Sequence, residues 1–403
     1  MTPTPMILPS RFLRLFEACA AAGGRALAIG GAVRDSCRGE APKDLDVEVH
    51  GLEPKRLEEV LRGLGRVGEV GKSFGVYKLR LGGDEVDVSV PRRDRLGPDG
   101  QRGHKGIVAE AAPFIGVKEA ARRRDLTINA IGWDPLQGVY EDPFDGLGDL
   151  DRRLLRAVDP GTFVEDPLRA LRVAQFAGRF GFRVDPELQA LCSAMPLDDL
   201  PAERVWGEVE KLLMRSPKPS VGWDVAAEAR IWARLVPEWA GRDVGAALDR
   251  IAAVPVDGKA RRLALLLAGA CDGLTAEQAA NVLDRLNVHR VDGYRVRDQV
   301  LALVQAAAGG EPRGREAVVR AAEGCEVELL ARLIGSAGLL EHAAAWGVVR
   351  QPLPALIGGK ELMAIGVARG PEMGSLLGRL REEQLSGRVL DRDAAIAWVT
   401  NCR

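Results

Sequence analysis

Residues 28–49 have the sequence AIGGAVRDSCRGEAPKDLDVEV, which is the most informative stretch of the chain. The Gly-Gly turn at 30–31 lets the backbone approach a phosphate closely, and Arg34 adds a forked cationic donor. Asp44 and Asp46 alternate with apolar residues, so a strand would place both carboxylates on one face. Neighbouring carboxylates repel each other, and a divalent cation such as Mg²⁺ removes that repulsion. The stretch therefore predicts a metal-dependent site that handles nucleotides.

A second alternating run, at 85–90, predicts a neighbouring strand with a third carboxylate. Glu85, Asp87 and Ser89 would share one face of that strand. In nucleotidyl transfer, carboxylates hold metal ions that activate the attacking hydroxyl and neutralise the leaving pyrophosphate. Asp87 and Glu85 are both candidates for this role, and a solvated strand face is the alternative.

Composition limits the class of protein. A chain of 403 residues is too long for one core, so roughly two to four domains are expected. The 56 Lys and Arg residues balance 57 Asp and Glu residues, so nucleic acid would bind at local patches. The scattered cysteines and the absence of a signal-peptide pattern indicate a reducing compartment. No apolar stretch reaches membrane-spanning length, and we expect a cytoplasmic protein without membrane contact.

The chain changes character near Asp151, where mixed strand and helix patterns give way to Ala-, Leu- and Arg-rich helical patterns. Before this point we expect helices at 10–24 and 54–64, and strands at 26–30, 44–49, 76–81 and 85–90. After it, SPKPSVG at 216–222 and GGEPRG at 309–314 predict boundaries between helical modules.

The segment 92–106 is rich in Gly, Pro and Arg and predicts a mobile loop. Two interpretations stay open: the loop clamps RNA phosphate or gates the nucleotide site, or it is only a disordered charged loop. Its basic side chains are Arg92, Arg93, Arg95, Arg102, His104 and Lys105.

A triple Arg at 122–124 precedes Asp-Leu-Thr-Ile-Asn-Ala at 125–130. Consecutive arginines are usually a solvated helix face. Here they lead into a pattern typical of an ordered, packed element, which favours a fixed Arg directed at a triphosphate.

The run VEDPLRALRVAQF at 164–176 predicts a helix on which Asp166, Arg169, Arg172 and Gln175 share a face. A surface ladder of salt bridges is one interpretation. A base-recognition face is the other, because a carboxylate can accept from the exocyclic amino group of cytosine or adenine while an Arg donates to the ring nitrogen. Uracil and guanine would leave a buried polar group unpaired, at a cost of about 1–3 kcal/mol.

Taken together, these motifs resemble the class II tRNA nucleotidyltransferases, the CCA-adding enzymes, and the related bacterial poly(A) polymerases. The resemblance is carried by GGAVRD, KDLD, RRRDLTINA, EDPFDGLGDLDRRLLRAV, EDPLRALR and ERVWGEVEKLL, in that order, and extends over residues 27–215. Residues 370–399 also resemble the tail of many of these enzymes, and residues 222–350 match only loosely. The family resemblance as a whole implies an α+β chain. It predicts a polymerase-β-like nucleotidyltransferase head at 1–150, followed by an all-helical neck, body and tail at 151–215, 216–350 and 351–403.

The resemblance also implies an activity and its residues: addition of C, C and A to the tRNA 3′ end from CTP and ATP by two-metal catalysis with Mg²⁺. No obligate protein partner is expected. Metal-binding and catalytic roles pass to Asp44 and Asp46, and the alternation at 85–90 adds Asp87 as the expected third catalytic carboxylate. Nucleotide-binding roles pass to Gly31, Arg34, Arg124, Asp166, Arg169 and Arg172, and the Gly-Gly turn described above adds Gly30.

The chain departs from the family pattern at two places. Gln175 stands where the family usually has Arg, which predicts weaker triphosphate binding or another group in its place. The stretch RLALLLAGACDGL at 262–274 lacks the His of a His-Asp phosphohydrolase module, so no phosphatase or phosphodiesterase activity is expected.

Other functions compete with full CCA addition. An A-adding enzyme, a CC-adding enzyme and a poly(A) polymerase would share these head motifs. A non-catalytic tRNA-binding protein is disfavoured by the intact carboxylates. A dinucleotide-binding oxidoreductase is disfavoured because the Gly-Gly turn lacks GxGxxG and a suitably spaced acidic residue.

Overall fold

The computed structural model describes residues 5–42, 44–69, 75–96 and 107–402. The chain forms two compact units. Unit 1 comprises Met1–Glu208 with Val221–Leu235, and unit 2 comprises Val209–Ser220 with Val236–Arg403. The boundary runs through helices α9 (Ala202–Arg215) and α10 (Pro219–Glu228). The four-part division into head, neck, body and tail stays a prediction.

Unit 1 is built on a seven-stranded mixed sheet with the order β3-β4-β5-β2-β1-β8-β9. Strands β2 and β5 run parallel, and the other neighbouring pairs are antiparallel. The expected strands are confirmed within one or two residues, whereas the short strands β3, β8 and β9 were not predicted. The bounds are β1 (Arg25–Ile29), β2 (Leu45–His50), β3 (Arg66–Glu69), β4 (Val76–Leu81), β5 (Asp84–Ser89), β8 (Gly132–Asp134) and β9 (Val139–Glu141).

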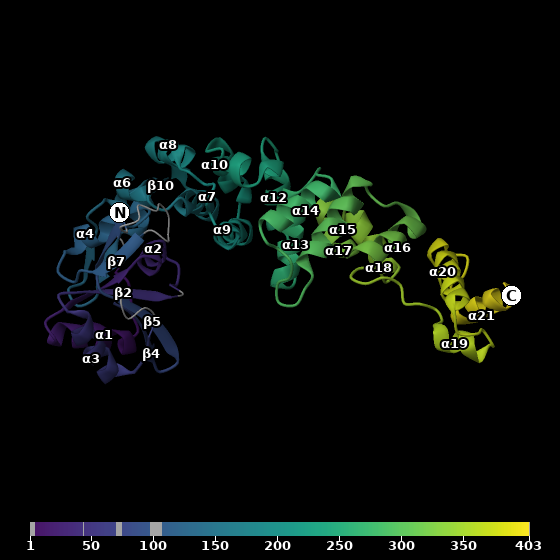
Figure 1. The fold of residues 1–403 in the computed structure, drawn as a ribbon, viewed down its shortest axis with the longest axis horizontal. Helices are drawn as coiled ribbons and strands as arrows, with labels where there is room; N and C mark the ends of the chain where they lie inside the picture. The colour runs from purple at the N-terminus through teal and green to yellow at the C-terminus, as the bar shows by residue number, and fades with distance from the viewer. Residues whose placement is uncertain (1–4, 43, 70–74, 97–106, 403) are drawn as a thin grey trace. The chain divides into compact units, whose positions relative to one another are not determined.

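The two faces of the central strands have different chemistry. On one face, β-branched residues of β2 and β5 are fully buried against α1 (Ser10–Ala21) and α3 (Pro54–Leu64), which lie below the sheet in Figure 1. Burial of such side chains is worth about 1.5–3 kcal/mol each. Alternation along the strands leaves the opposite face to Asp46 and Asp87. The hydrophobic core therefore fixes which way these carboxylates point.

The prediction of a loop over 92–106 is wrong for its first residues. Residues Arg92–Leu96 form β6, which pairs antiparallel with β7 (Ile107–Ala111). Charged side chains are common on a small two-stranded ribbon that leaves its edges open, so an Arg-rich segment can form a strand there. The residues 97–106, which include Arg102, His104 and Lys105, lie outside the described part of the chain.

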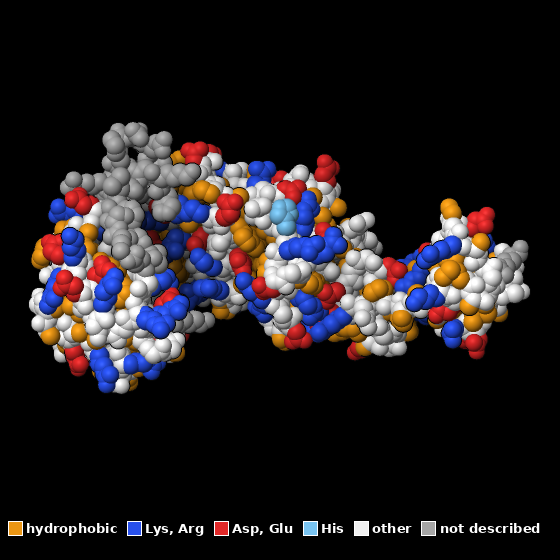
Figure 2. All heavy atoms as spheres, turned by 60° about the horizontal axis from the view of Figure 1, so that its bottom comes forward, with side chains coloured by type: hydrophobic (Ala, Val, Ile, Leu, Met, Phe, Trp, Pro, Cys, Tyr) orange, Lys and Arg blue, Asp and Glu red, His pale blue; other side chains and the backbone are white. Residues whose placement is uncertain are grey.

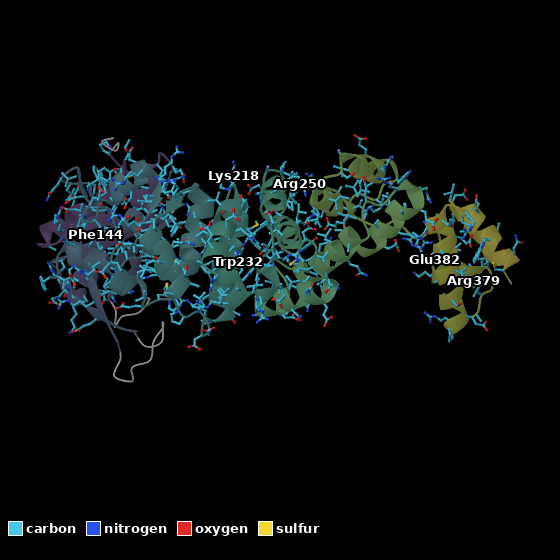
Figure 3. All side chains as sticks on the ribbon, turned by 90° about the horizontal axis from the view of Figure 1, so that it is seen from above. Phe144, Lys218, Trp232, Arg250, Arg379 and Glu382 are labelled. Atoms are coloured by element: carbon cyan, nitrogen blue, oxygen red, sulfur yellow. The ribbon has the colours of Figure 1, made fainter. Side chains whose placement is uncertain are left out.

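Short helices and a second ribbon complete unit 1. Strand β10 (Leu154–Leu155) pairs parallel with β11 (Arg183–Val184). Trp232, labelled in Figure 3, packs against Trp223 with ring centroids 4.8 Å apart. The remaining elements are α2 (Gly31–Cys37), α4 (Val117–Arg122), η2 (Thr127–Asn129), α5 (Gly146–Arg152), α6 (Pro160–Phe163), α7 (Leu168–Phe180), α8 (Pro186–Ala194) and α11 (Ile231–Leu235).

Unit 2 is helical throughout its described residues apart from an isolated bridge. Its elements are η3 (Pro237–Trp239), α12 (Gly245–Ala252), α13 (Lys259–Ala270), α14 (Ala276–Arg285), α15 (Val296–Ala308), α16 (Gly314–Gly324), α17 (Val327–Ile334), α18 (Ala337–Ala345), α19 (Gly359–Ala364), α20 (Pro371–Ser386) and α21 (Arg392–Asn401). A mixed sheet followed by helices confirms the expected α+β class.

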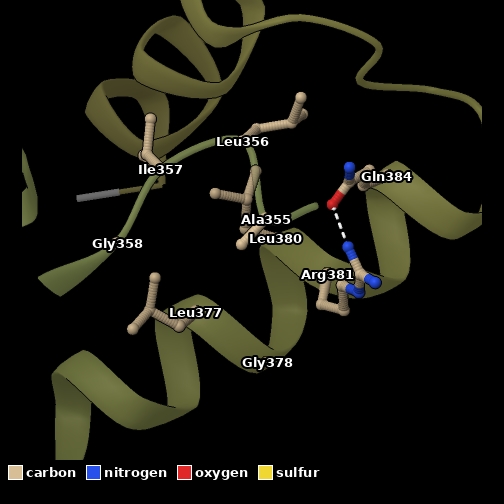
Figure 4. A pocket seen from close by; sticks show the side chains of 9 residues that line it. All are labelled: Ala355, Leu356, Ile357, Gly358, Leu377, Gly378, Leu380, Arg381 and Gln384. Atoms are coloured by element: carbon tan, nitrogen blue, oxygen red, sulfur yellow. Dashed lines mark hydrogen bonds between the residues drawn. The ribbon is translucent and has the colours of Figure 1, made fainter. Parts of the chain in front are cut away.

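The last three helices pack around a hydrophobic cluster of their own, which includes Leu362, Ala395 and Val399. Beside it lies the pocket in Figure 4, where Arg381 donates to Gln384 at 2.6 Å. The pocket is lined by Ala355, Leu356, Ile357, Gly358, Leu377, Gly378, Leu380, Arg381 and Gln384.

The surface carries both signs of charge. Figure 2 shows Lys and Arg side chains interspersed with Asp and Glu on the visible face, consistent with the balanced composition. Among the described residues, no helix combines the length and apolar character that crossing a bilayer requires.

Candidate active site

The glycine turn between β1 and α2 lies beside the side chains of Arg124 and Asp46. Gly30 has φ of 71°, a left-handed conformation that favours glycine. A Cβ at this position would lie 3.1 Å from Arg124 Nη1 and 3.7 Å from Asp46 Oδ2. Gly31 is the first residue of α2, so its end of the helix directs free backbone N–H groups outward. Three sequence motifs therefore converge at Gly30.

We expect Gly30→Ala to destabilise the protein by about 1–2 kcal/mol, because alanine disfavours the left-handed region. Gly31→Ala is the matched control, because Gly31 is helical and its added Cβ would lie 3.4 Å from Arg34 Nη2. That control should be near neutral, since alanine favours a helix. Hydrogen exchange of the peptides around α2 in the two variants checks this prediction, and equal losses of protection would contradict it.

The carboxylates meet across the parallel pair of strands. Asp46 of β2 is in register with Asp87 of β5, and Asp44 lies exposed just before β2. The pKa of Asp46 is raised, first by burial and further by the charges of Asp87 and Asp44, although Arg124 opposes the shift. Negative charge is thus concentrated at one point of the sheet, where a cation would relieve it.

Glu85 lies in a different environment from Asp87, although both occupy the same face of β5 as expected. Its carboxylate accepts from Lys78 Nζ at 2.6 Å and from Arg80 Nε at 3.2 Å. Lys78 approaches Asp87 less closely, at 3.5 Å. Geometry therefore favours Asp87 over Glu85 as the third carboxylate.

These carboxylates fit a divalent cation whose remaining ligands would come from water and substrate. Within the described ranges no cluster of three or more His, Cys, Asp or Glu side chains is already gathered as a metal site. Mg²⁺ is commonly held by one or two carboxylates together with water and substrate phosphates. Asp46 with Asp87, and Asp44 beside them, supply oxygen ligands of this type.

Arg34, which follows the glycine turn, is buried and only 4% exposed. Its Nη1 donates to Asn129 Oδ1 at 2.5 Å. Nε donates to Asp35 at 2.8 Å, and the guanidinium lies over the ring of Phe180 at 4.9 Å from its centroid. Direct nucleotide contact by Arg34 stays a prediction, while its packing joins α2 to α7.

Asp125 is the centre of this buried network, although no role was predicted for it. It accepts from Asn129 Nδ2 at 2.9 Å, from the Leu126 backbone at 2.8 Å and from Arg172 Nε at 2.8 Å. Burial opposes its ionisation, but the charge of Arg172 and these hydrogen bonds outweigh it and lower the pKa of Asp125 to about 2. The sequence feature that could have indicated this role is a pair of polar residues, Asp125 and Asn129, within an otherwise packed run.

The helix predicted over 164–176 begins later than expected. Helix α7 starts at Leu168, because Pro167 disfavours a helical conformation for the residue before it. Asp166 therefore lies ahead of the helix, and its carboxylate accepts from Arg204 of α9 and from the Leu168 backbone. Asp166 and Arg169 are nevertheless one turn apart as expected, since the Arg169 N–H donates to the Asp166 carbonyl at 3.0 Å, and Arg204 is a partner that the sequence did not reveal.

Arg169 and Arg172 project from α7 into different surroundings. Arg169 donates to the carbonyl oxygens of Thr162 and Arg123, at 2.6 and 2.5 Å. Arg172 is paired with Asp125 at 2.7 Å. Both cations thus fix the segment that follows α4.

Gln175 is 3% exposed, and its amide Nε2 has no hydrogen-bond partner within the described structure. An arginine there would bring a charge that this environment would have to compensate. The uncharged amide avoids that cost, and its effect on triphosphate binding stays a prediction.

Comparison with known sequences identifies related proteins. The model of the poly(A) polymerase head domain matches residues 26–156. A multifunctional CCA protein of Xanthomonas oryzae is 32% identical over 412 residues, covering 88% of this chain and 96% of its own length. A multifunctional CCA protein of Nitrosococcus oceani is 40% identical over 214 residues, covering 52% of this chain and 50% of its own length. The chain thus spans about half the length of several curated relatives that it matches.

Solved structures resemble the chain over nearly its full length. The Bacillus stearothermophilus CCA-adding enzyme in complex with CTP has a TM-score of 0.71 at 24% identity, covering 98% of both chains. The Thermotoga maritima CCA-adding enzyme complexed with tRNA has a TM-score of 0.65 at 20% identity, covering 98% of this chain and 96% of that chain. These likenesses confirm the predicted fold, a nucleotidyltransferase-type head followed by helices.

Proposed function

Because the chain belongs to the family of class II CCA-adding enzymes and poly(A) polymerases, we propose that it adds C, C and then A to the 3′ end of tRNA from CTP and ATP. The observation that carries the proposal is the convergence of Gly30, Asp46 and Arg124. A glycine turn, a fixed cation and a carboxylate in register with a second carboxylate form a suitable site for a nucleoside triphosphate and a metal. We further propose that the protein acts in the cytoplasm, where tRNA is processed.

The family uses divalent metal ions, and we propose that the ion here is Mg²⁺. Asp46 and Asp44 would hold it, with Asp87 as the third carboxylate. When bound, it would lower the pKa of the attacking hydroxyl and neutralise charge on the leaving pyrophosphate.

The protein's own residues supply the remaining contacts. Arg124 Nη1 donates to the Asn129 carbonyl at 3.1 Å, which leaves other donors of its guanidinium available for a phosphate beside Gly30. Backbone N–H groups at Gly31 would contact the same phosphates. Buried contacts of Arg34 and Arg172 hold the surrounding helices in place, so the site is preorganised before the nucleotide arrives.

Base selection is assigned to the segment that begins α7. A carboxylate has about four acceptor positions, and Asp166 uses three of them on Arg204 and the Leu168 backbone. The fourth can accept from the exocyclic amino group shared by cytosine and adenine. Arg169, with two donors on backbone carbonyls, is held where a further N–H can donate to a ring nitrogen. UTP and GTP would be rejected.

Stepwise addition tests the proposal. The purified protein is given tRNA transcripts ending in N, NC and NCC, where N is the nucleotide before CCA, with labelled CTP or ATP. We expect CTP to be incorporated on the first two acceptors and ATP on the third. ATP on NCC without any CTP on N would indicate an A-adding enzyme, CTP alone would indicate a CC-adding enzyme, and long ATP tails on unstructured RNA would indicate a poly(A) polymerase.

A further inference from the structure

The face of β2 that carries Asp46 continues into a buried ionic cluster that the mechanism above leaves without a role. Residues 46, 48 and 50 share this face, because side chains two positions apart in a strand point the same way. Glu48 and His50 are 3% and 8% exposed, and His50 Nε2 lies 3.3 Å from Glu48 Oε1. The second carboxylate oxygen of Glu48 lies 3.2 Å from Arg123 Nη2. A buried carboxylate on this strand therefore holds a cation rather than facing solvent.

Both oxygens of the Glu48 carboxylate lie close to basic side chains. The Glu48 side chain, 4% exposed, lies between His50 and Arg123. A buried ion pair broken on one side leaves an uncompensated charge. Glu48 therefore fixes the position of the Arg123 guanidinium, and the Arg123 backbone is fixed by Arg169.

Arg123 also faces a pocket beside the catalytic carboxylates. The lining of this pocket includes Asp46, Asp87, Ser89, Arg92 and Arg123. The Arg123 side chain remains 22% exposed, and its Nε–H is buried without a hydrogen-bond partner in the described structure. Two arginines and two carboxylates thus line the same pocket, which suits a phosphate group close to a metal site.

The pocket adjoins the residues assigned to the incoming nucleotide, since Ile29, next to Gly30, is part of its lining. It shares Asp46 with them, but its lining contains neither Gly30 nor Arg124. In-line phosphoryl transfer places the attacking hydroxyl and the leaving group on opposite sides of the phosphorus. If the triphosphate lies against Gly30 and Arg124, the attacking 3′-hydroxyl must approach from the side of Asp87.

We propose that Arg123, positioned by Glu48 and His50, binds the phosphate of the 3′-terminal linkage of the acceptor RNA. This inference rests on the proposed function and deepens it, since it names the contact that orients the acceptor. Arg123 is assigned to binding, whereas Glu48 and His50 act through it as positioning residues.

The test removes the charge from the RNA as well as from the protein. A tRNA acceptor ending in CC is prepared with either a normal phosphate or a neutral methylphosphonate at its last linkage. Binding without nucleotide is measured by fluorescence anisotropy, and KM is measured for the acceptor and for ATP. The variants are Arg123→Met, Glu48→Gln and the control Arg122→Met, whose native side chain is 43% exposed and pairs with Glu119 and Asp159.

In the unmodified protein and the Arg122→Met control, we expect methylphosphonate to weaken acceptor binding about tenfold, as for loss of one charge-assisted contact. Arg123→Met should be insensitive to the replacement, with a raised KM for acceptor and an unchanged KM for ATP. Glu48→Gln should lose most of the sensitivity. The two RNAs are compared within each variant, so a general loss of stability affects both equally.

An equal methylphosphonate effect in Arg123→Met and the unmodified protein would overturn the inference. A raised KM for ATP with an unchanged KM for acceptor would also overturn it, because Arg123 would then belong to the triphosphate site. Failure of the proposed function has a different signature: no nucleotide is added to any acceptor. The anisotropy comparison does not require addition and still decides whether Arg123 contacts the terminal phosphate.

Discussion

Asp46→Asn is expected to lower the rate of nucleotide addition by about a thousandfold or more, while leaving the fold intact. Metal-assisted charge stabilisation is worth several kcal/mol, and each 1.36 kcal/mol is about a factor of ten in rate. An amide keeps the shape of the side chain and removes the charge that holds the cation. Single-turnover addition to a tRNA acceptor measures the loss.

The same substitution should leave the metal-free protein as stable as before or slightly more stable. The raised pKa of Asp46 has burial as its main cause and the charges of Asp87 and Asp44 as further causes, so its ionised form is disfavoured in the folded protein. Glu85→Gln is the matched control, since Glu85 lies on β5 and is paired with Lys78. Nearly full activity of Asp46→Asn, or an equal loss in Glu85→Gln, would contradict the assignment.

Asp125→Ala is expected to destabilise unit 1 by about 3–5 kcal/mol, which is the usual cost of removing one partner of a buried ion pair. The change leaves Arg172 without its carboxylate and removes the acceptor of Asn129 Nδ2. Asn129 in turn orients Arg34. The loss should therefore extend from the segment after α4 to both α2 and α7.

Hydrogen exchange followed by mass spectrometry checks this prediction, because the two units can unfold separately and one melting temperature would mix them. Peptides from α2 and α7 should exchange faster in Asp125→Ala, whereas peptides from unit 2 should not change. Asp151→Ala, at an exposed position of α5, is the control. Unchanged protection in α2 and α7 would show that Asp125 does not hold these helices together.

Local patterns were sufficient to predict much of the head. Alternation located β2 and β5, and the apolar spacing of 54–64 located α3. The register that brings Asp87 beside Asp46 was not predictable, because it depends on pairing between segments about forty residues apart. The sequence left both Glu85 and Asp87 as candidates, and the pairing of β5 with β2 separates them together with the contacts of Glu85 to Lys78 and Arg80.

Long-range partners account for what the sequence did not predict. Asp166 was expected to act with Arg169 on one helix, but its ion-pair partner is Arg204, which comes from a later helix. Asp125 had no assigned role, because its importance comes from Arg172 on α7. Spacing along one helix can be derived from sequence, whereas the contact between two helices depends on tertiary packing.

The most direct test of the central claim is the sequence of the product ends. A tRNA transcript lacking CCA is incubated with the protein, Mg²⁺ and all four nucleoside triphosphates, and the 3′ ends are read by sequencing. The account predicts that products end in C, C and A and then stop growing. Products that end in CC alone, tails of A, or frequent U and G would contradict it.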